Sequence, residues 1–151
     1  MIDAWSLKFL SGQKRLDAIA LKRAGRRSAA IYLMGYALEF ALKHKIAHTL
    51  AFASGFPESR SELNFYAPQI QTFNTISTGI PLTNIGQIKN HKLDLLLSYS
   101  GAESRIKSSY LNEWMIVREW NPENRYIIKR YSKDKVNEFL KAGEVIVNEI
   151  V

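Results

Sequence analysis

Cysteine is absent from the 151 residues of this chain. Its absence excludes disulfide bonds, thiolate nucleophiles, iron–sulfur clusters and thiolate zinc sites. Long apolar runs are missing too: the most apolar stretch, 29–38, is too short for a membrane-spanning helix, which needs about 20 residues. The first residues, 1–5, lack the basic region and cleavage site of a signal peptide. We therefore expect a cytoplasmic protein with no membrane partner.

Acidic residues are scarce beside basic ones, with 14 Asp and Glu against 21 Lys and Arg and a net charge of +7. The excess is concentrated in residues 1–27, which contain seven basic and two acidic side chains. A basic balance favours polyanionic partners such as nucleic acid, nucleotides or an acidic protein. The cluster at 22–27 is either such a contact or a solvated corner whose cations stabilise the end of a helix.

Helical periodicity dominates the chain, and no segment shows the alternation of a strand. Helices are expected over 3–23, 29–53, 90–99, 104–119 and from about 132 onward. The first should bury one apolar face, formed by Trp5, Phe9, Leu16 and Ile19. The second is apolar on nearly every side as far as Leu42 and should be the central helix. In its second half, the residues expected to face outward are Lys43, His44, Lys45 and His48.

The expected fold class is all-α: an up-and-down bundle of four main helices plus a short fifth helix. Its length fits a single domain, 1–151, with an irregular insertion at 54–90 that is either a functional lid or partly mobile. Ser59-x-x-Glu62 has the form of a capping box that starts a short helix toward Tyr66. The short fifth helix is expected there or around Pro122.

Sequence motifs for metal, phosphate or acyl chemistry are missing. The chain has no GxSxG, GxxxxGK[ST] or GxGxxG. His44 and His48 are four residues apart, as in zinc sites, but Lys43 and Lys45 flank them and the glutamate of HExxH is absent. We expect no bound metal and no cofactor.

Glu39 is the only charged residue within 29–41, on the helix expected to be most buried. A buried carboxylate requires a partner, because desolvating a lone charge costs several kcal/mol. Lys43 lies one turn later, and Arg118 or Arg125 are candidates through space. The pattern fits either a structural ion pair or a functional carboxylate.

The segment 117–126 combines guanidinium, indole, amide and phenol groups at a helix break forced by Pro122. Arginine binds phosphate through two parallel hydrogen bonds, and aromatic rings stack on bases. The candidate ligand-binding residues are Arg118, Trp120, Asn121, Arg125 and Tyr126, with Glu39 orienting an arginine. The alternative is a helix end and turn, with Trp120 and Tyr126 covering one end of the bundle.

Three stretches resemble HEPN-domain proteins. The string Ala30-Ile31-Tyr32-Leu33-Met34-Gly35-Tyr36-Ala37-Leu38-Glu39-Phe40-Ala41-Leu42-Lys43 resembles their second helix. The start of a helix at His91-x-Leu93, followed by Leu96-Leu97, and the corner Trp120-x-Pro122-Glu123-x-Arg125-Tyr126 are similar as well. The resemblance covers about 4–53 and 88–150 and leaves 54–90 outside it.

The resemblance implies a helical bundle that pairs as a homodimer, often beside a nucleotidyltransferase partner. Many members of this family are metal-independent endoribonucleases with an Arg-x(4–6)-His motif. This chain has no such motif; the nearest match is Arg118-x5-Asn124-x-Tyr126, with asparagine in place of histidine. Because asparagine does not take up a proton near pH 7, acid–base catalysis would be largely lost.

Three hypotheses follow. The preferred one is a dimeric, non-catalytic module that binds RNA, a nucleotide or a nucleotidyltransferase partner through Arg118, Arg125 and Tyr126. The second is a ribonuclease with a diverged motif, in which Arg118, Asn124 and Tyr126 are the candidate catalytic residues and His91 or Glu39 acts as the base. The third is a purely structural oligomerisation domain.

Overall fold

The computed structural model describes residues 1–73, 79–127 and 129–151. Within them the chain is all-α, as predicted, and its only β-type pairing is an antiparallel bridge between Ile2 and Phe56. The long helices are α1 (Ala4–Arg23), α2 (Arg27–Thr49) and α8 (Lys133–Ile150). The shorter helices are α3 (Arg60–Phe65), α4 (Ala67–Phe73), α5 (Leu93–Ser100), α6 (Glu103–Ser109) and α7 (Leu111–Val117). Two 3-10 helices, η2 (Ile85–Gln87) and η3 (Pro122–Tyr126), complete the described elements.

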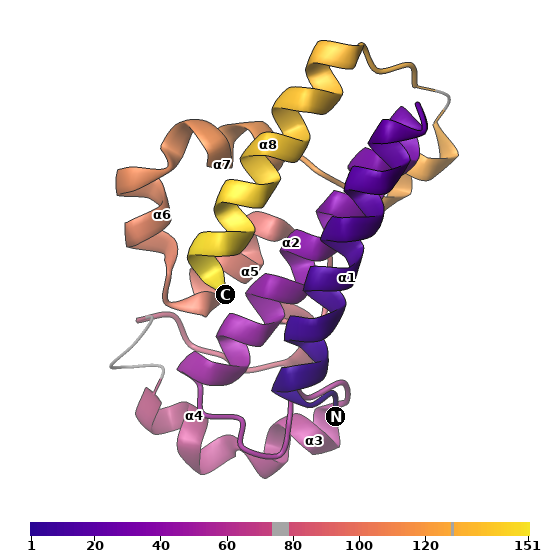
Figure 1. The fold of residues 1–151 in the computed structure, drawn as a ribbon. Helices are drawn as coiled ribbons and strands as arrows, with labels where there is room; N and C mark the ends of the chain where they lie inside the picture. The colour runs from indigo at the N-terminus through magenta and orange to yellow at the C-terminus, as the bar shows by residue number, and fades with distance from the viewer. Residues whose placement is uncertain (74–78, 128) are drawn as a thin grey trace.

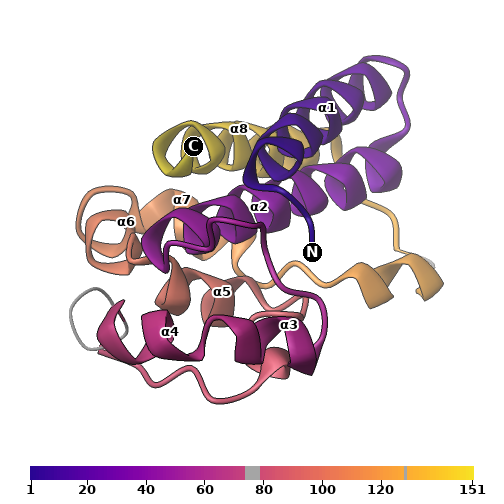
Figure 2. The same ribbon diagram turned by 90° about the horizontal axis from the view of Figure 1, so that it is seen from below.

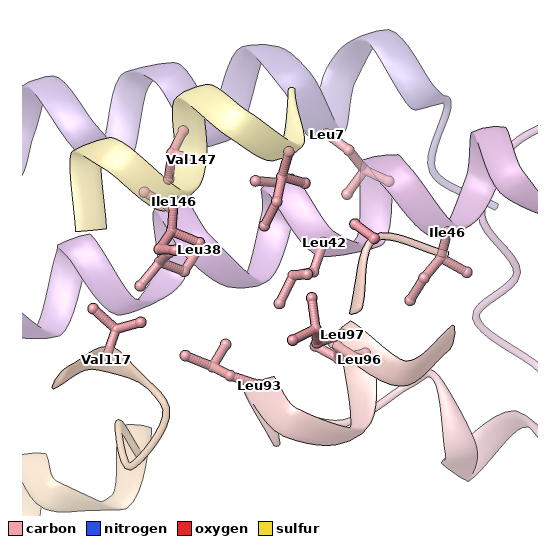
Figure 3. Packing of buried hydrophobic residues seen from close by; sticks show 14 of the residues in the cluster. Leu7, Leu38, Leu42, Ile46, Leu93, Leu96, Leu97, Val117, Ile146 and Val147 are labelled. Carbon is pink, nitrogen blue, oxygen red and sulfur yellow. The ribbon is translucent and has the colours of Figure 1, made fainter. Parts of the chain in front are cut away.

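Helix α2 is the centre of the molecule, as its apolar sequence predicts. It lies between α1 and α8 on one side and α5 on the other (Figures 1 and 2). Leu42 of α2 points toward Leu96 and Leu97 of α5, and Leu38 lies close to Ile146 of α8 in the same core cluster (Figure 3). Packing on several sides at once explains why this helix carries so few exposed polar residues.

Helix α1 packs through a different face from the one its large apolar residues suggest. Leu7, Ser11 and Ala18 are the buried residues, whereas Trp5, Phe9 and Leu16 are exposed, so the predicted core face is wrong. Small side chains let α1 approach α2 closely, and Ser11 Oγ donates a hydrogen bond of 2.7 Å to the carbonyl of Ala37.

The second half of α2 also departs from expectation. Lys43 and His44 are buried and Lys45 is half-buried, so that of the four residues expected to face outward only His48 is exposed. The physical reason is that both buried groups have polar partners. Lys43 pairs with Glu39, and His44 Nδ1 lies 2.7 Å from the carbonyl of Ala4.

The segment 54–90 contains α3, α4 and η2, which lie below α2 and beside α5 in Figure 2. The predicted capping box at Ser59 is confirmed in one of its two hydrogen bonds, since the Ser59 side chain accepts a hydrogen bond of 3.2 Å from the backbone NH of Glu62. The Glu62 carboxylate accepts its backbone hydrogen bond, of 2.8 Å, from the NH of Glu58 rather than from that of Ser59. The predicted role of 54–90 as a lid or a partly mobile segment concerns residues 74–78 as well, and these lie outside the described part of the chain.

The helix expected over 104–119 is instead two, α6 and α7, which are separated at Tyr110. The final helix is as predicted: its apolar stripe is buried over Val136, Phe139, Leu140, Gly143, Val147 and Ile150. Gly101, with φ of 74°, ends α5 in the left-handed conformation that glycine adopts readily. No described helix combines the length and apolar character needed to cross a bilayer.

Candidate functional site

Trp120 fixes the corner between α7 and η3 onto the middle of α2. Its side chain is buried, and a Cβ atom placed on Gly35 would lie 1.8 Å from Cε2 of the indole. The glycine therefore provides the room that the indole needs. Asn121 caps η3 by accepting a hydrogen bond of 3.0 Å from the NH of Glu123. This anchor brings η3 alongside the first turns of α2.

A cavity of about 270 Å³ lies between the start of α2, η3 and the chain that leads to α8. We call it the Arg125 pocket. The residues of its lining that carry polar or aromatic groups include Tyr32, Trp120, Asn121, Asn124, Arg125 and Lys129. No Asp or Glu is among the described residues that line it. The pocket therefore combines two cations with aromatic and amide surfaces.

Arg125 is held in this pocket by phenol groups rather than by an acid. Its guanidinium donates a hydrogen bond of 3.0 Å to the Tyr32 hydroxyl and one of 2.6 Å to the Tyr126 hydroxyl. The guanidinium carbon also lies 4.7 Å from the centre of the Tyr126 ring. No carboxylate of the described residues forms an ion pair with Arg125. Its charge is thus oriented but not neutralised.

Tyr32 and Tyr36 continue the polar row along α2. Their hydroxyl oxygens are 3.4 Å apart, and their rings meet edge to face. Burial raises the pKa of the Tyr36 hydroxyl to about 12. The hydrogen bond with Tyr36, and then the one from Arg125, lowers the pKa of Tyr32. In the contact between the two phenols, the Tyr32 hydroxyl is the donor and the Tyr36 hydroxyl oxygen is the acceptor.

Glu39 and His91 form a second polar cluster next to this row. The Glu39 side chain is 2% exposed, and its two oxygens contact Lys43 Nζ at 2.5 Å and His91 Nδ1 at 2.7 Å. The His91 side chain is 54% exposed, and its ring meets the ring of Tyr36 edge to face at 6.1 Å. One nitrogen of His91 is therefore held by a buried carboxylate while the ring stays accessible to solvent.

The arginines expected near Glu39 are elsewhere. Of its three candidate partners, Lys43 is confirmed, whereas neither Arg118 nor Arg125 contacts it. Arg118 instead pairs with Asp94 at 2.6 Å and approaches Glu119 at 3.5 Å. Arg118 is also not part of the lining of the Arg125 pocket.

The structure thus groups the predicted site residues in three places. Trp120, Asn121 and Arg125 surround the pocket together with Asn124, and Tyr126 lies beside it against Arg125. Glu39 lies in the second polar cluster, with Lys43 and His91, which we call the His91 cluster. Arg118 lies apart from both, in its ion pair with Asp94. Sequence reasoning did not identify Tyr32, Tyr36 or Lys129 as site residues. A sequence signal for the two tyrosines does exist: Tyr32 and Tyr36 are four residues apart on the predicted helix, shortly before Glu39, so their side chains are expected to lie on the same face.

His44 and His48, which are one turn apart on α2, contact each other, with ring centres 4.6 Å apart. Burial lowers the pKa of His44, whose Nδ1 is already engaged by the Ala4 carbonyl. Among the described residues, no group of three or more His, Asp or Glu side chains is placed to hold a metal ion.

Comparison of the chain with protein-family models, with curated proteins and with solved structures gives no match. The HEPN resemblance therefore stays a prediction from the sequence. The arguments for function below depend on the geometry of the Arg125 pocket and of the His91 cluster.

Proposed function

We propose that the protein is a non-catalytic module that binds a nucleotide, or a nucleotide unit of RNA, in the Arg125 pocket. The observation that carries the proposal is Arg125 itself, an exposed guanidinium oriented by two tyrosines with no carboxylate partner among the described residues. Such a group is available for phosphate, because a phosphate would add charge-assisted hydrogen bonds without displacing an existing ion pair.

The remainder of the pocket suits the base and sugar of such a ligand. Tyr32 and Trp120 offer aromatic surface, while Asn121 and Asn124 carry amide groups that donate and accept hydrogen bonds. Lys129 adds a second cation. The net charge of +7 supports the same class of ligand through long-range attraction.

The HEPN-like arrangement of the bundle, the homodimer and the nucleotidyltransferase partner belong to this proposal through the resemblance of 30–43 and 120–126 to that family. They are tested separately from the pocket. Sedimentation of the protein at micromolar concentration tests the homodimer, and a monomer under these conditions contradicts it.

Binding of a mononucleotide and of a short single-stranded RNA, measured by calorimetry over a series of salt concentrations, tests the pocket. We expect Arg125→Gln to weaken binding at least about tenfold and to reduce the salt dependence by about one phosphate contact. Arg105→Gln on α6 is the matched control, since it removes the same charge at an exposed site away from the pocket. Superimposable titrations for Arg125→Gln and the wild type would overturn the proposal.

A second candidate function, metal-independent RNA cleavage, is favoured by the contact between Glu39 and His91. A buried carboxylate that accepts the Nδ1 proton of His91 leaves Nε2 as the base. Nε2 would remove the proton of a ribose 2′-hydroxyl, whose oxygen attacks the adjacent phosphorus. The 5′-oxygen then leaves and takes a proton from water, which gives a 2′,3′-cyclic phosphate and a free 5′-hydroxyl.

Incubation of a labelled RNA pool in EDTA tests this candidate. Cleavage that His91→Ala abolishes and that His48→Ala leaves unchanged would replace the binding module with an enzyme. Intact RNA after long incubation with the wild type, combined with measurable binding, supports the binding module instead.

A further inference from the structure

Helix α1 has a second apolar face that no described element covers. Trp5, Phe9 and Leu16 are 70%, 50% and 53% exposed. They lie on the side of α1 opposite its buried residues, because successive helical residues are rotated by about 100°. In both views α1 lies at the edge of the bundle, with α2 and α8 on its inner side (Figures 1 and 2).

The exposed residues have the spacing of a helix-packing seam. Positions 5, 9, 12, 16 and 19 are separated alternately by four and three residues, the repeat that keeps one stripe of a helix facing a partner helix. We call this stripe the α1 seam. The Trp5 and Phe9 rings are stacked, with centres 5.3 Å apart and planes inclined by 14°. At the middle of the seam, a Cβ on Gly12 would meet nothing within 4 Å, so the surface there is open.

Positive charge borders the seam along one of its two edges, and Arg23, the next position of the same repeat, is a further exposed cation at its end. Lys8, Arg15 and Lys22 follow one another at intervals of seven residues, whereas the opposite edge carries Ser6, Gln13 and Ala20. Arg15 is paired with Glu144 of α8 at 3.0 Å. Lys8 and Lys22 are exposed and have no ion pair with a carboxylate of the described residues.

One further cation lies beyond the end of the seam. Trp5 borders a hollow of about 440 Å³ whose lining also includes Lys8, Lys45, His48 and Val151. A side chain of a bound helix that extends past Trp5 would therefore meet Lys45 in addition to Lys8.

We propose that the α1 seam is the docking site for an acidic amphipathic helix of a partner protein. The apolar side of that helix would cover Trp5, Phe9 and Leu16, and its carboxylates would pair with Lys8 and Lys22. The alternation of four and three residues is typical of a surface that packs against another helix, so we infer that the occupant is a helix. The row of cations along the edge of the seam favours a helix with acidic side chains, because opposite charges then face each other.

A second copy of this chain fits the seam poorly on charge. An antiparallel pair of α1 helices centred on Gly12 brings Lys8 of one copy beside Arg15 of the other. A parallel pair aligns the two basic clusters at 22–27. Both orientations place like charges together, which opposes association.

Two synthetic helices about four heptads long provide the probes, both with leucine at every a and d position. One carries glutamate at e and g and the other lysine, so that each peptide repels itself. Binding is measured by calorimetry and by the emission of tryptophan, since Trp114 and Trp120 are already buried and Trp5 is the one that docking would cover. We expect the glutamate peptide to bind at least tenfold more tightly than the lysine peptide and to shift the emission to shorter wavelength.

Two double variants, each with a matched control double variant, test whether the peptide binds at the seam. Phe9→Ser with Leu16→Ser should reduce affinity for the glutamate peptide at least tenfold, whereas Leu111→Ser with Met115→Ser, at comparably exposed positions of α7, should not. Lys8→Glu with Lys22→Glu should reverse the preference between the two peptides. Lys133→Glu with Lys135→Glu changes the net charge equally, at exposed positions of α8, and should preserve the preference.

The proposal is overturned if the glutamate peptide does not bind, or if both peptides bind equally. It is also overturned if the protein alone forms a dimer that Phe9→Ser with Leu16→Ser dissociates, since the occupant is then a second copy. A larger shift of the tryptophan emission with anionic phospholipid vesicles than with the glutamate peptide would assign the seam to a membrane surface instead. Because Arg125 is not part of the seam, Arg125→Gln should leave peptide binding unchanged.

Discussion

The indole of Trp120 lies directly over Gly35, in a gap that a single methyl group would close. This contact joins the corner after α7 to the middle of α2, and it also forms one wall of the Arg125 pocket. Tyr36, one residue further along α2, meets the same indole edge to face at 5.1 Å. The shape of the candidate site therefore depends on the absence of a side chain at position 35.

We expect Gly35→Ala to destabilise the protein and to impair ligand binding by the pocket. The new Cβ would lie 1.8 Å from Cε2 and 2.0 Å from Nε1 of Trp120, so the indole must move. Overpacking of this kind typically costs about 1–3 kcal/mol. Urea denaturation followed by tryptophan fluorescence measures the loss, and a nucleotide titration measures the effect on the pocket.

Gly12→Ala is the matched control, because it changes the same residue type in a helix with open space around the new methyl group. It should raise the stability by about 0.5–1 kcal/mol, since alanine loses less backbone entropy than glycine on entering a helix. Equal effects of the two substitutions would contradict the packing argument.

A further prediction concerns the buried pair of Glu39 and Lys43. Lys43→Met should destabilise the protein by about 3 kcal/mol, because it removes the cation that pairs with a buried carboxylate and leaves only the imidazole of His91 in contact with it. Adding Glu39→Gln to Lys43→Met should recover part of the loss, since a neutral amide costs less to bury than an unpaired carboxylate. Chemical denaturation of the two single variants and the double variant measures the coupling between the residues. Additive effects would show that the two side chains do not interact.

Much of the fold could be predicted because helix formation is governed by local signals. The cap at Ser59, the end of α5 at Gly101 and the apolar stripe of α8 are visible in short stretches of sequence. The choice between two faces of α1 is not local. The face with the larger apolar residues was the natural prediction, yet the smaller Ser11 and Ala18 are buried because they allow a close approach to α2. That preference depends on the shape of the neighbouring helix.

The candidate site could be predicted only in part, for a related reason. The corner at 118–126 is conspicuous because its polar and aromatic groups are adjacent in sequence. Its contact with Tyr32, 93 residues from Arg125, has no sequence signal of its own. The charge of Glu39 indicated that a partner was needed, but its pairing with His91 across 52 residues depends on how α5 approaches α2.

The stability of the protein should fall as the pH drops below about 6.5, in part because of His44. Burial lowers the pKa of His44 in the folded state from the model-peptide value of 6.5, so the unfolded chain binds this proton more readily. The contribution of the neutral imidazole is complete above the unfolded pKa and is lost as the pH falls toward the folded pKa. Thermal melts from pH 8 to pH 5 should show a smaller decline for His44→Asn, whose amide can still donate to the Ala4 carbonyl. A decline as steep as that of the wild type would contradict this assignment, and His48→Asn controls for removal of an exposed histidine.

Asp94 should contribute to stability through two groups that it holds at once. One oxygen accepts a hydrogen bond of 2.8 Å from Trp114 Nε1, and the other pairs with Arg118 at 2.6 Å. Asp94→Ala removes the acceptor of a buried indole NH, and a buried donor left without a partner costs about 1–3 kcal/mol. Asp94→Asn keeps a carbonyl oxygen for the indole and loses mainly the partly exposed ion pair with Arg118, so it should cost less than Asp94→Ala. Denaturation of both variants distinguishes the two contributions. Equal losses would mean that the ion pair, rather than the indole hydrogen bond, is what Asp94 provides.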